Sequence, residues 1–537
     1  MAEAAVTLDD KYTLDKGRVF ITGVQALARL PMVQRQRDVL NGLNTAGFIS
    51  GYRGSPVGGY DQQLWNARKF LENNHIKFQP GLNEDLAASA IWGSQQTNLF
   101  EGGKYDGVFG IWYGKGPGVD RCGDVFKHGN MSGPSKHGGV LLIAGDDHAA
   151  KSSTVPHQSE FAFVDASIPV LNPAGVQEIL DYGVLGFEMS RFSGCWVAFK
   201  TTAENMDSSS SIDVSPNRIN IELPDFDMPA DGLHIRWPDD WIEQEHRLHN
   251  YKLNAVRAFA RANGIDKVVM DSSTAKLGIV TTGKSYLDVR QALEDLGITE
   301  EKADAIGIRL YKIGMPWPLE PMGVHEFAEG LEEILVIEEK RPLIENQLKE
   351  ELYNYPSNKR PRIVGKLDEK QQPLQSAAGV LTANQIASVI ASRIALFDQG
   401  SEIQRQLRIM EAREAQLVQS KTDFARTPYF CSGCPHNTST KVPEGSRATA
   451  GIGCHFMSVW MDRDTSTFTH MGAEGTPWIG QAAFTETKHI FANLGDGTYT
   501  HSGALAIRAS AASGVNITYK ILYNDAVAMT GGQPADG

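Results

Sequence analysis

The sequence predicts a multidomain α/β protein built on parallel β-sheets. Short apolar, β-branched runs alternate with helical stretches from about residue 20 to about residue 200, and the same pattern returns twice further along the chain. Continuous apolar strands separated by helices are typical of a parallel sheet whose two faces are both covered. A chain of 537 residues has room for about three domains of ordinary size.

The first α/β unit is expected over residues 21–204, after an N-terminal tail over residues 1–20. Its helices separate apolar runs of strand length, and two of these runs lead directly into glycine-rich loops. The strands are expected at residues 47–50, 108–112, 140–144 and 196–200.

Residues 205–275 interrupt this rhythm and are expected to form a linker that ends in a connecting helix. A serine run at residues 208–211 and the prolines at positions 224, 229 and 238 discourage regular structure. Between residues 248 and 259, apolar side chains recur at helical spacing, which predicts the connecting helix.

A second α/β unit is expected over residues 276–345. Apolar runs at residues 277–280 and 333–337 predict two buried strands, with a helix around residues 286–296 between them. Residues 346–428 then form a connector.

The connector carries a long charged helix over residues 402–426, whose charges we interpret as a solvated face. The third unit, residues 429–537, ends after a strand at residues 517–523 and one glycine-rich loop. Because one strand and one loop do not complete an α/β sheet, we expect the chain to be a fragment that ends inside its last domain.

The composition is typical of globular domains and excludes several other classes of protein. Hydrophobic residues make up 41% of the chain and charged residues 21%. A formal net charge of −13 argues against nucleic-acid binding. No run approaches the ~18 apolar residues of a membrane helix, and the N-terminus lacks a secretion signal. Five cysteines are too few for a disulfide framework and fit a reducing cytoplasm.

The strongest chemical motif lies in the third unit, at the ends of two successive strands. Gly495, Asp496 and Gly497 follow an apolar run at residues 490–493, and Asn524 follows the next strand. The glycines permit a tight turn, and the amides of a following helix favour an anion such as a diphosphate. Oxygens of Asp496 and Asn524, with a backbone carbonyl, suit Mg²⁺. A simple turn is the alternative, but the second oxygen donor favours the signature of thiamine-diphosphate enzymes.

Three of the five cysteines, Cys431, Cys434 and Cys454, lie close together in the sequence at the head of the same unit. Soft thiolates with this spacing suit an iron–sulfur cluster or a zinc site, although a redox pair or chance clustering is also consistent. A [4Fe–4S] cluster normally takes four thiolates. Either His436 or His455 therefore completes a zinc site, or a fourth cysteine lies beyond residue 537.

Asn83 and Glu84 open a helix rich in small residues. Asn83 is a good N-cap, and an acid in the first turn complements the helix dipole. The functional alternative is that Glu84 holds the aminopyrimidine ring of thiamine. A carboxylic acid there favours the imino tautomer, which removes the proton from C2. The resulting nucleophile attacks a 2-oxo acid, and the thiazolium ring accepts the electrons released on decarboxylation.

Together these motifs resemble the 2-oxoacid:ferredoxin oxidoreductases, most closely the indolepyruvate ferredoxin oxidoreductase branch. The sequence GYRGSP at residues 51–56 is similar to the family's G-Y-P-G-[ST]-P loop, with Arg53 in place of the usual proline. Residues 145–160 resemble a loop that faces the active site in the family. Residues 524–533 resemble the family's N-N-x-x-Y-x-M-T-G-G-Q, with Asp525 and Ala528 departing from it.

The resemblance implies three cofactors, which are thiamine diphosphate, Mg²⁺ and a [4Fe–4S] cluster. It makes Glu84 the activating acid and places Gly495 and Gly497 against the cofactor. The implied Mg²⁺ ligands are Asp496, Asn524 and the carbonyl of Ala526, and the implied cluster ligands are Cys431, Cys434 and Cys454.

The resemblance also implies the reaction and the domain types. An aryl 2-oxo acid such as indolepyruvate loses CO₂, its electrons pass through the cluster to ferredoxin, and coenzyme A takes the acyl group as an arylacetyl thioester. Residues 21–204 would be a pyrimidine-type domain, residues 429–537 a diphosphate-type domain, and residues 276–345 a structural domain similar to the transketolase C-terminal domain. A homodimer is expected of the full-length protein.

Two other functions stay open at the level of the sequence. One is a non-oxidative thiamine-diphosphate decarboxylase or carboligase whose cysteines bind zinc. The other is an electron-transfer or structural subunit that keeps the fold without catalysis.

Overall fold

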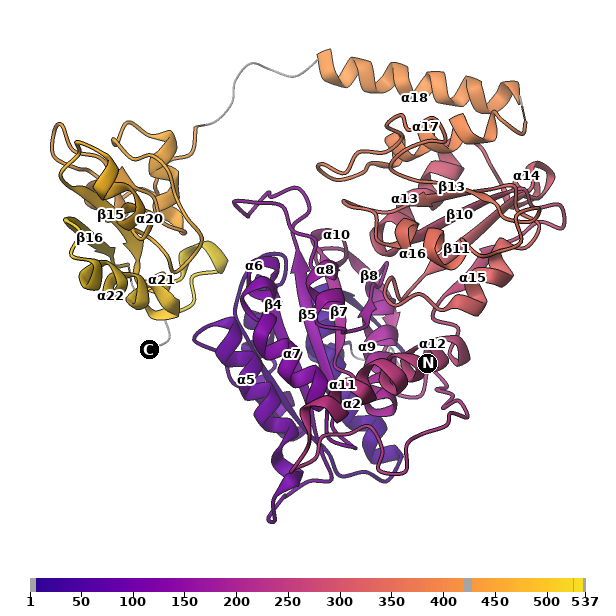
Figure 1. Ribbon diagram of the computed structural model, residues 1–537, viewed down its shortest axis with the longest axis horizontal. Helices are drawn as coiled ribbons and strands as arrows, with labels where there is room; N and C mark the ends of the chain where they lie inside the picture. The colour runs from indigo at the N-terminus through magenta and orange to yellow at the C-terminus, as the bar shows by residue number, and fades with distance from the viewer. Residues whose placement is uncertain (1–5, 399, 420–426, 525, 535–537) are drawn as a thin grey trace. The chain divides into compact units, whose positions relative to one another are not determined.

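The chain divides into two units, Met1–Gln419 and Ser420–Gly537, which are described separately. The computed structural model describes residues 6–398, 400–419, 427–524 and 526–534. Both units contain parallel sheets flanked by helices (Figure 1), which confirms the predicted α/β class.

The larger sheet of the first unit has six parallel strands in the order β3-β2-β4-β5-β7-β6. All four predicted strands are present in it, as β2, β4, β5 and β7. The third of these is buried at every position, as expected for a strand covered on both faces. The strands are β2 (Ala46–Gly51), β3 (Ile76–Phe78), β4 (Val108–Lys115), β5 (Val140–Asp146), β6 (Val170–Leu171) and β7 (Val197–Thr202).

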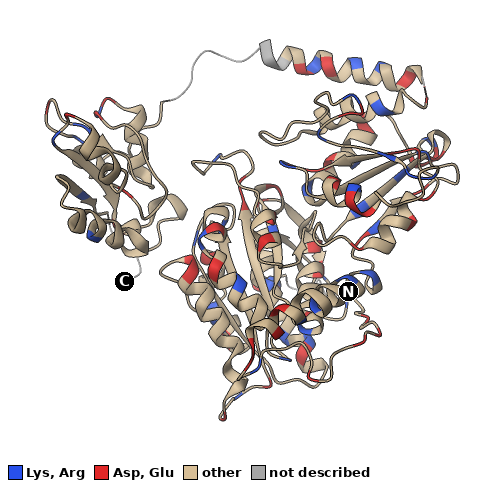
Figure 2. Cartoon of the chain, viewed as in Figure 1, with Lys and Arg blue, Asp and Glu red and all other residues tan. Residues whose placement is uncertain are grey.

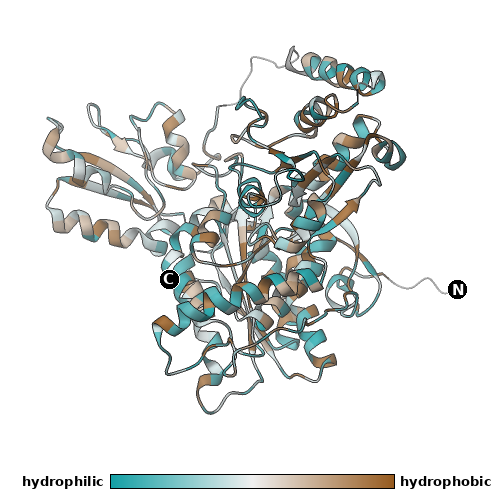
Figure 3. Ribbon diagram, turned by 45° about the vertical axis from the view of Figure 1, so that its right-hand side comes forward, coloured by the Kyte–Doolittle hydropathy of each residue, from teal (hydrophilic) through white to brown (hydrophobic). Residues whose placement is uncertain are grey.

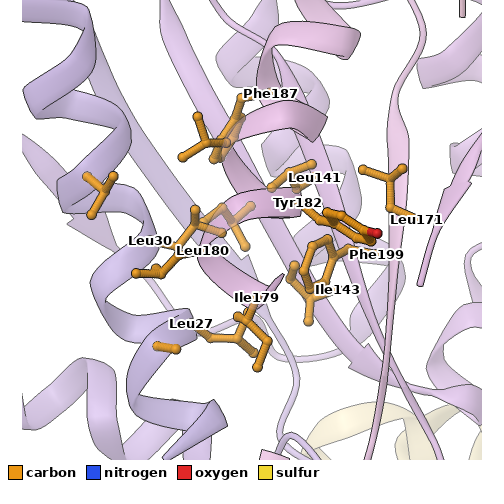
Figure 4. Packing of buried hydrophobic residues seen from close by; sticks show 14 of the residues in the cluster. Leu27, Leu30, Leu141, Ile143, Leu171, Ile179, Leu180, Tyr182, Phe187 and Phe199 are labelled. Carbon is orange, nitrogen blue, oxygen red and sulfur yellow. The ribbon is translucent and has the colours of Figure 1, made fainter. Parts of the chain in front are cut away.

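Two helices, α2 (Gly23–Leu40) and α9 (Val176–Ser193), cover one face of this sheet. Figure 4 shows how their apolar side chains meet those of the central strands. Burial of this area is the main stabilising contribution to the unit. The labelled buried residues are Leu27, Leu30, Ile179, Leu180, Tyr182 and Phe187 from the helices, and Leu141, Ile143, Leu171 and Phe199 from the strands.

A second core fills the opposite face of the same sheet. Trp112 of β4 and Leu142 of β5 belong to it, whereas their neighbours in sequence point to the first face, because side chains alternate along a strand. The covering helices are α5 (Glu84–Gln95), α6 (Gly116–Arg121), α7 (Gly123–Ser132) and α8 (Glu160–Asp165).

The N-terminal segment differs from the tail that we expected. It forms α1 (Asp10–Thr13) and β1 (Arg18–Thr22), and Tyr12 is buried. The strand β1 pairs in antiparallel register with β8 (Ser209–Asp213), so the serine run predicted to be irregular is a strand. Three of the five β8 residues are exposed, and serines are tolerated there because only Ile212 needs to face the core.

The connecting helix lies where the apolar spacing placed it. It consists of α11 (Trp241–Arg247), a π-helical turn (Leu248–Lys252) and α12 (Leu253–Ala262). Its apolar residues, including Val256 and Phe259, join the core that α2 and α9 form on the sheet.

A five-stranded sheet follows in the order β13-β12-β10-β11-β9, parallel except for the antiparallel edge strand β9. The two predicted strands are its central strands β10 and β12, and the predicted helix is α13 (Gly283–Asp295). The strands are β9 (Lys267–Met270), β10 (Leu277–Thr282), β11 (Ile308–Ile313), β12 (Glu333–Ile337) and β13 (Arg362–Val364).

Two helices complete the first unit, α17 (Ala383–Ile394) and α18 (Ser401–Gln419). Acidic and basic residues are distributed along α18 (Figure 2), as the predicted charged helix requires. Residues 420–426, the end of that predicted helix, lie outside the described residues.

The second unit holds three parallel strands in the order β14-β15-β16. They are β14 (Ala448–Thr449), β15 (Ile490–Gly495) and β16 (Ile517–Leu522). The helix predicted after β15 begins with a π-helical turn (Tyr499–Gly503) and continues as α22 (Ala504–Ser513). Hydrophobic residues gather on the strands of the sheets, and hydrophilic residues line most of the outer turns (Figure 3).

A search of the described helices finds none that combines the length and the apolar composition needed to cross a membrane.

We predict that the buried ion pair between Asp38 and Arg191 is a major determinant of the stability of the first unit. The two carboxylate oxygens accept hydrogen bonds of 2.6 and 2.8 Å from the guanidinium, joining α2 to α9. The Asp38 and Arg191 side chains are only 1% and 8% exposed. Asp38→Asn removes the two-point carboxylate partner of the buried Arg191 guanidinium, which keeps its contact of 2.9 Å with Glu188. Removing one partner of a buried pair costs roughly 3–5 kcal/mol, measured by urea unfolding.

The exposed pair between Arg68 and Glu72 provides the control, because both of its side chains are more than half exposed. Glu72→Gln should cost less than about 1 kcal/mol. Equal urea midpoints for the two variants would contradict the expected role of the buried pair.

Candidate functional site

The parallel strands of the six-stranded sheet bring several polar loops to one edge. Strands β2, β4, β5 and β7 all end at this edge in consecutive register. In open α/β sheets, ligands bind outside the carboxyl ends of the strands. The loops after β2 and β5, and the start of α6 directly after β4, therefore form the part of the first unit best placed to bind a ligand.

Glu84 lies at this edge, at the N-terminus of α5, and is only 7% exposed. The Asn83 side chain accepts a hydrogen bond of 3.0 Å from the Leu86 amide, so the predicted N-cap is present. The Glu84 backbone carbonyl accepts a hydrogen bond of 2.9 Å from the Trp112 indole. These contacts fix the backbone from which the Glu84 carboxylate projects, which an activating acid requires.

Helix α6 packs tightly against the Glu84 side chain. A Cβ atom placed on Gly118 would lie 2.5 Å from Glu84 Cγ, which is closer than two carbon atoms can approach. Only glycine therefore allows this packing. Burial and the nearby Glu84 carboxylate raise the pKa of the Cys122 thiol, which agrees with a position beside this site.

Arg53, which replaces the proline of the family's loop, is buried and ion-paired. Its guanidinium lies 3.6 Å from Asp61 of α3 (Gly58–Asn66) and over the ring of Tyr52. Asp61 also accepts a hydrogen bond of 2.6 Å from Tyr113. Burial and the Asp61 charge raise the pKa of Tyr113 well above its usual range, so Tyr113 stays a proton donor. Arg53 thus anchors the loop after β2 to the adjoining helix.

The loop over residues 147–159 is tied together at its base and within its first half. Both Asp146 oxygens accept hydrogen bonds from Ser159, at 2.9 Å from the amide and 2.5 Å from the hydroxyl. Asp147 accepts bonds from the Ser152 amide at 2.7 Å and the Ser153 hydroxyl at 2.9 Å. Although burial opposes it, these hydrogen bonds lower the pKa of Asp147, which therefore keeps its charge and the loop shape.

The second unit brings Asp496, Asn524 and Ala526 together. Strands β15 and β16 pair in parallel with Gly495 opposite Leu522, so the two loops begin at the same edge. The Asp496 carboxylate accepts a bond of 3.0 Å from the Asn524 amide. The Asn524 side-chain oxygen accepts a bond of 3.3 Å from the Ala526 amide. A carboxylate and an amide oxygen on adjoining loops are the hard donors that Mg²⁺ prefers, and these residues fit that ion.

Two buried histidines lie beside the loops that carry Asp496 and Asn524. The sequence indicates each as an alternative zinc ligand but does not predict that their rings lie close together. The rings of His436 and His455 lie 5.8 Å apart at 80°. Gly453, with φ of +147°, lies against the His455 ring and leaves no room for a side chain. Burial, and then the neighbouring His436, lower the pKa of His455 to about 3, so it is neutral. Only the spacing of each histidine after a cysteine hinted at them.

The cysteines of the second unit lie near one another. The Cys434 amide donates a 3.0 Å bond to the Cys431 carbonyl, and the Asn437 side chain donates to both carbonyls. Burial raises the pKa of Cys454, and the nearby Cys434 and Cys431 raise it further. Among the described residues, however, no three or more His, Cys, Asp or Glu side chains are arranged to hold a metal ion. Thiolates are the type of donor that an iron–sulfur cluster takes, but the described geometry does not show such a site, and the cluster stays a prediction.

Comparison with known proteins shows that the chain is similar to proteins named as indolepyruvate oxidoreductase subunits. Residues 267–417 match the model of the indolepyruvate oxidoreductase domain. The indolepyruvate oxidoreductase subunit IorA of Pyrococcus horikoshii is 26% identical over 426 residues, covering 75% of this chain and 62% of the relative. The corresponding subunit of Methanothermobacter marburgensis is 22% identical over 549 residues, covering 99% of this chain and 79% of the relative.

The chain spans 62% of the length of the first of these relatives. A solved 2-oxoglutarate:ferredoxin oxidoreductase from Magnetococcus marinus aligns with a TM-score of 0.49 and 16% identity, over 71% of this chain and 65% of that one. The matches to the family model and to the curated relatives confirm the resemblance that the motifs predicted. The chain is therefore similar in sequence to the subunits named as indolepyruvate oxidoreductases, and residues 267–417 match their domain model.

Proposed function

We propose that this chain is the thiamine-diphosphate-binding part of an enzyme that oxidatively decarboxylates an aryl 2-oxo acid of the indolepyruvate type. The observation that carries the proposal is the joined pair of loops after β15 and β16. There the Asp496 carboxylate accepts a hydrogen bond from the backbone amide of Asn524, and the Asn524 side-chain oxygen accepts one from the backbone amide of Ala526. Sequence relatives named as indolepyruvate oxidoreductase subunits support the substrate class.

In this proposal the second unit binds the diphosphate end of the cofactor. Asp496, Asn524 and the Ala526 carbonyl hold Mg²⁺, and Gly495 and Gly497 let the backbone approach the diphosphate. When bound, thiamine diphosphate supplies the nucleophilic carbon and accepts the electrons released on decarboxylation. The protein contributes the oxygen ligands and the fixed backbone around them.

Glu84 is the proposed acid at the aminopyrimidine ring. Its carboxyl group holds a proton or a hydrogen bond at the ring nitrogen, which favours the tautomer able to remove a proton. Its burial and the tight packing of Gly118 restrict the directions in which the carboxylate can point. Such restriction lowers the entropic cost of bringing the carboxylate into the geometry that the reaction requires.

Cys431, Cys434 and Cys454 are proposed to hold a [4Fe–4S] cluster, with a fourth ligand from outside this set of three. Electrons leave through this cluster to a ferredoxin, and coenzyme A takes the acyl group as a thioester. The relatives are named as subunits, which supports an assembly of more than one chain, and we propose that it contains two copies of this one. All five cysteines are free, which fits action in a reducing cytoplasm.

The first prediction from the proposed function concerns Glu84. Glu84→Gln should lower 2-oxo-acid-dependent dye reduction by roughly 10²–10⁴-fold, as expected on losing a positioned acid, while binding of thiamine diphosphate stays intact. Asp85→Asn is the matched control, because Asp85 lies in the same helical turn but pairs with Arg121 at 3.0 Å. Full activity of Glu84→Gln, or an equal loss in both variants, would remove Glu84 from its assigned role.

The second prediction concerns the thiols. In metal-free protein, iodoacetamide should modify Cys431, Cys434 and Cys454, which are exposed or partly exposed. Cys122 and Cys195 are buried, and burial raises the pKa of Cys195 to about 11. They should react on the order of a hundredfold more slowly, because the thiolate is the reactive form.

Reconstitution with iron and sulfide should then protect the three reactive thiols. Metal analysis of the purified protein should give iron and acid-labile sulfide. About one zinc per chain, with neither iron nor sulfide, would contradict the oxidative reaction and favour a non-oxidative enzyme.

A further inference from the structure

The turn after β12, residues 338–343, is held in an unusual shape in the domain that matches the family model. Lys340 has φ of +58°, which is uncommon for a residue with a side chain. Strain of this kind persists only where the surroundings impose it. They do so here, because the buried Glu338 side chain accepts hydrogen bonds of 3.1 and 2.9 Å from the Leu343 and Ile344 amides.

The Lys340 side chain contacts a loop outside its own domain. Lys340 is 8% exposed, and its ammonium group donates a hydrogen bond of 2.8 Å to the His148 carbonyl. It also donates one of 3.1 Å to Gly379, so it links the loop after β5 to two segments of the five-stranded domain. A buried ammonium group without such acceptors would be costly.

Arg341 makes a reciprocal contact with the far end of the same loop. The Gln158 side-chain oxygen accepts bonds of 3.1 and 3.2 Å from the Arg341 amide and side chain. The Gln158 side-chain nitrogen donates a 3.1 Å bond to the Arg341 carbonyl. The Arg341 guanidinium also lies 3.9 Å from the centre of the Phe161 ring. Two consecutive residues therefore hold the loop near both of its ends.

The loop in turn lies against the helical turn that packs on Glu84. His157 is 3.2 Å from Asp120 of α6, and a Cβ atom on Gly116 would lie 2.4 Å from the His157 ring. Gly118, two residues further along α6, makes the close approach to Glu84. A displacement of the loop would therefore change its contacts with α6, and α6 in turn packs against the Glu84 side chain.

We propose that Lys340 and Arg341 are positioning residues and that the domain carrying them serves to hold the loop over residues 147–159 in place. We call the contacts of Lys340 with His148 and of Arg341 with Gln158 the clasp. The effect of the clasp on catalysis rests on the function proposed above. Its effect on the loop does not, because every contact in it belongs to the first unit.

The two domains are also joined by contacts that do not belong to the clasp, so the effect of the clasp can be distinguished from that of domain packing. Lys312 of β11 pairs with Glu178 of α9, and Asn172 donates a hydrogen bond of 3.2 Å to Thr282. These contacts join the five-stranded domain to the six-stranded domain of the first unit without touching the loop. Cutting the clasp should therefore free the loop while the two domains stay together.

Hydrogen exchange of the purified protein tests this proposal. In Lys340→Met and in Gln158→Ala, the backbone amides of residues 148–158 should exchange at least about tenfold faster than in the wild type, with unchanged exchange in β10. Lys359→Met, at an exposed position of the same domain, should leave the loop unaffected. Lys312→Met should alter exchange at the domain contact and not in the loop.

Unchanged loop exchange in both clasp variants, or an equal change in Lys312→Met, would overturn the proposal. In an active wild-type enzyme, kcat/KM for the 2-oxo acid should fall about tenfold in Gln158→Ala, with its unfolding temperature unchanged. Faster loop exchange together with an inactive wild type, tested with a panel of 2-oxo acids, would contradict the proposed function and leave the clasp standing. The two failures are therefore distinguishable.

Discussion

Parallel pairing in register is the constraint on which the candidate site residues of each unit depend. In the second unit it sets Gly495 of β15 opposite Leu522 of β16, so that Asp496 and Asn524 begin their loops at the same edge. In the first unit it aligns the ends of β2, β4 and β5, where Glu84 and the loop over residues 147–159 lie. A shift of one residue in either sheet would turn every side chain to the opposite face and separate these groups.

Close packing at these edges is the second feature that the two units share. Gly118 meets Glu84 in the first unit, and Gly453 meets His455 in the second. Interiors packed this densely transmit small displacements instead of absorbing them. A site built in this way holds its polar groups in fixed directions before any ligand arrives, which reduces the free-energy cost of binding and of catalysis.

The sequence predicted the parts of this arrangement that are encoded locally. Continuous apolar runs identified the central strands, the residues after two such runs led to Asp496 and Asn524 as candidates, and the expected start of a helix led to Glu84. It failed where pairing depends on distant segments. The strand β8 is polar, and only its partner β1, far away in the sequence, makes it a strand. The contact of Gln158 with Arg341 spans 183 positions, and Arg341 carries no motif of its own. The spacing of the cysteines in the sequence also did not predict how their side chains are arranged in space.

The most direct measurement is anaerobic reduction of a viologen dye by the complete protein, supplied with thiamine diphosphate and Mg²⁺. A panel of aryl and aliphatic 2-oxo acids would be offered, each with and without coenzyme A. The account predicts dye reduction that requires coenzyme A and is strongest with an aryl-pyruvate. Release of CO₂ or aldehyde without dye reduction would contradict it and indicate a non-oxidative decarboxylase.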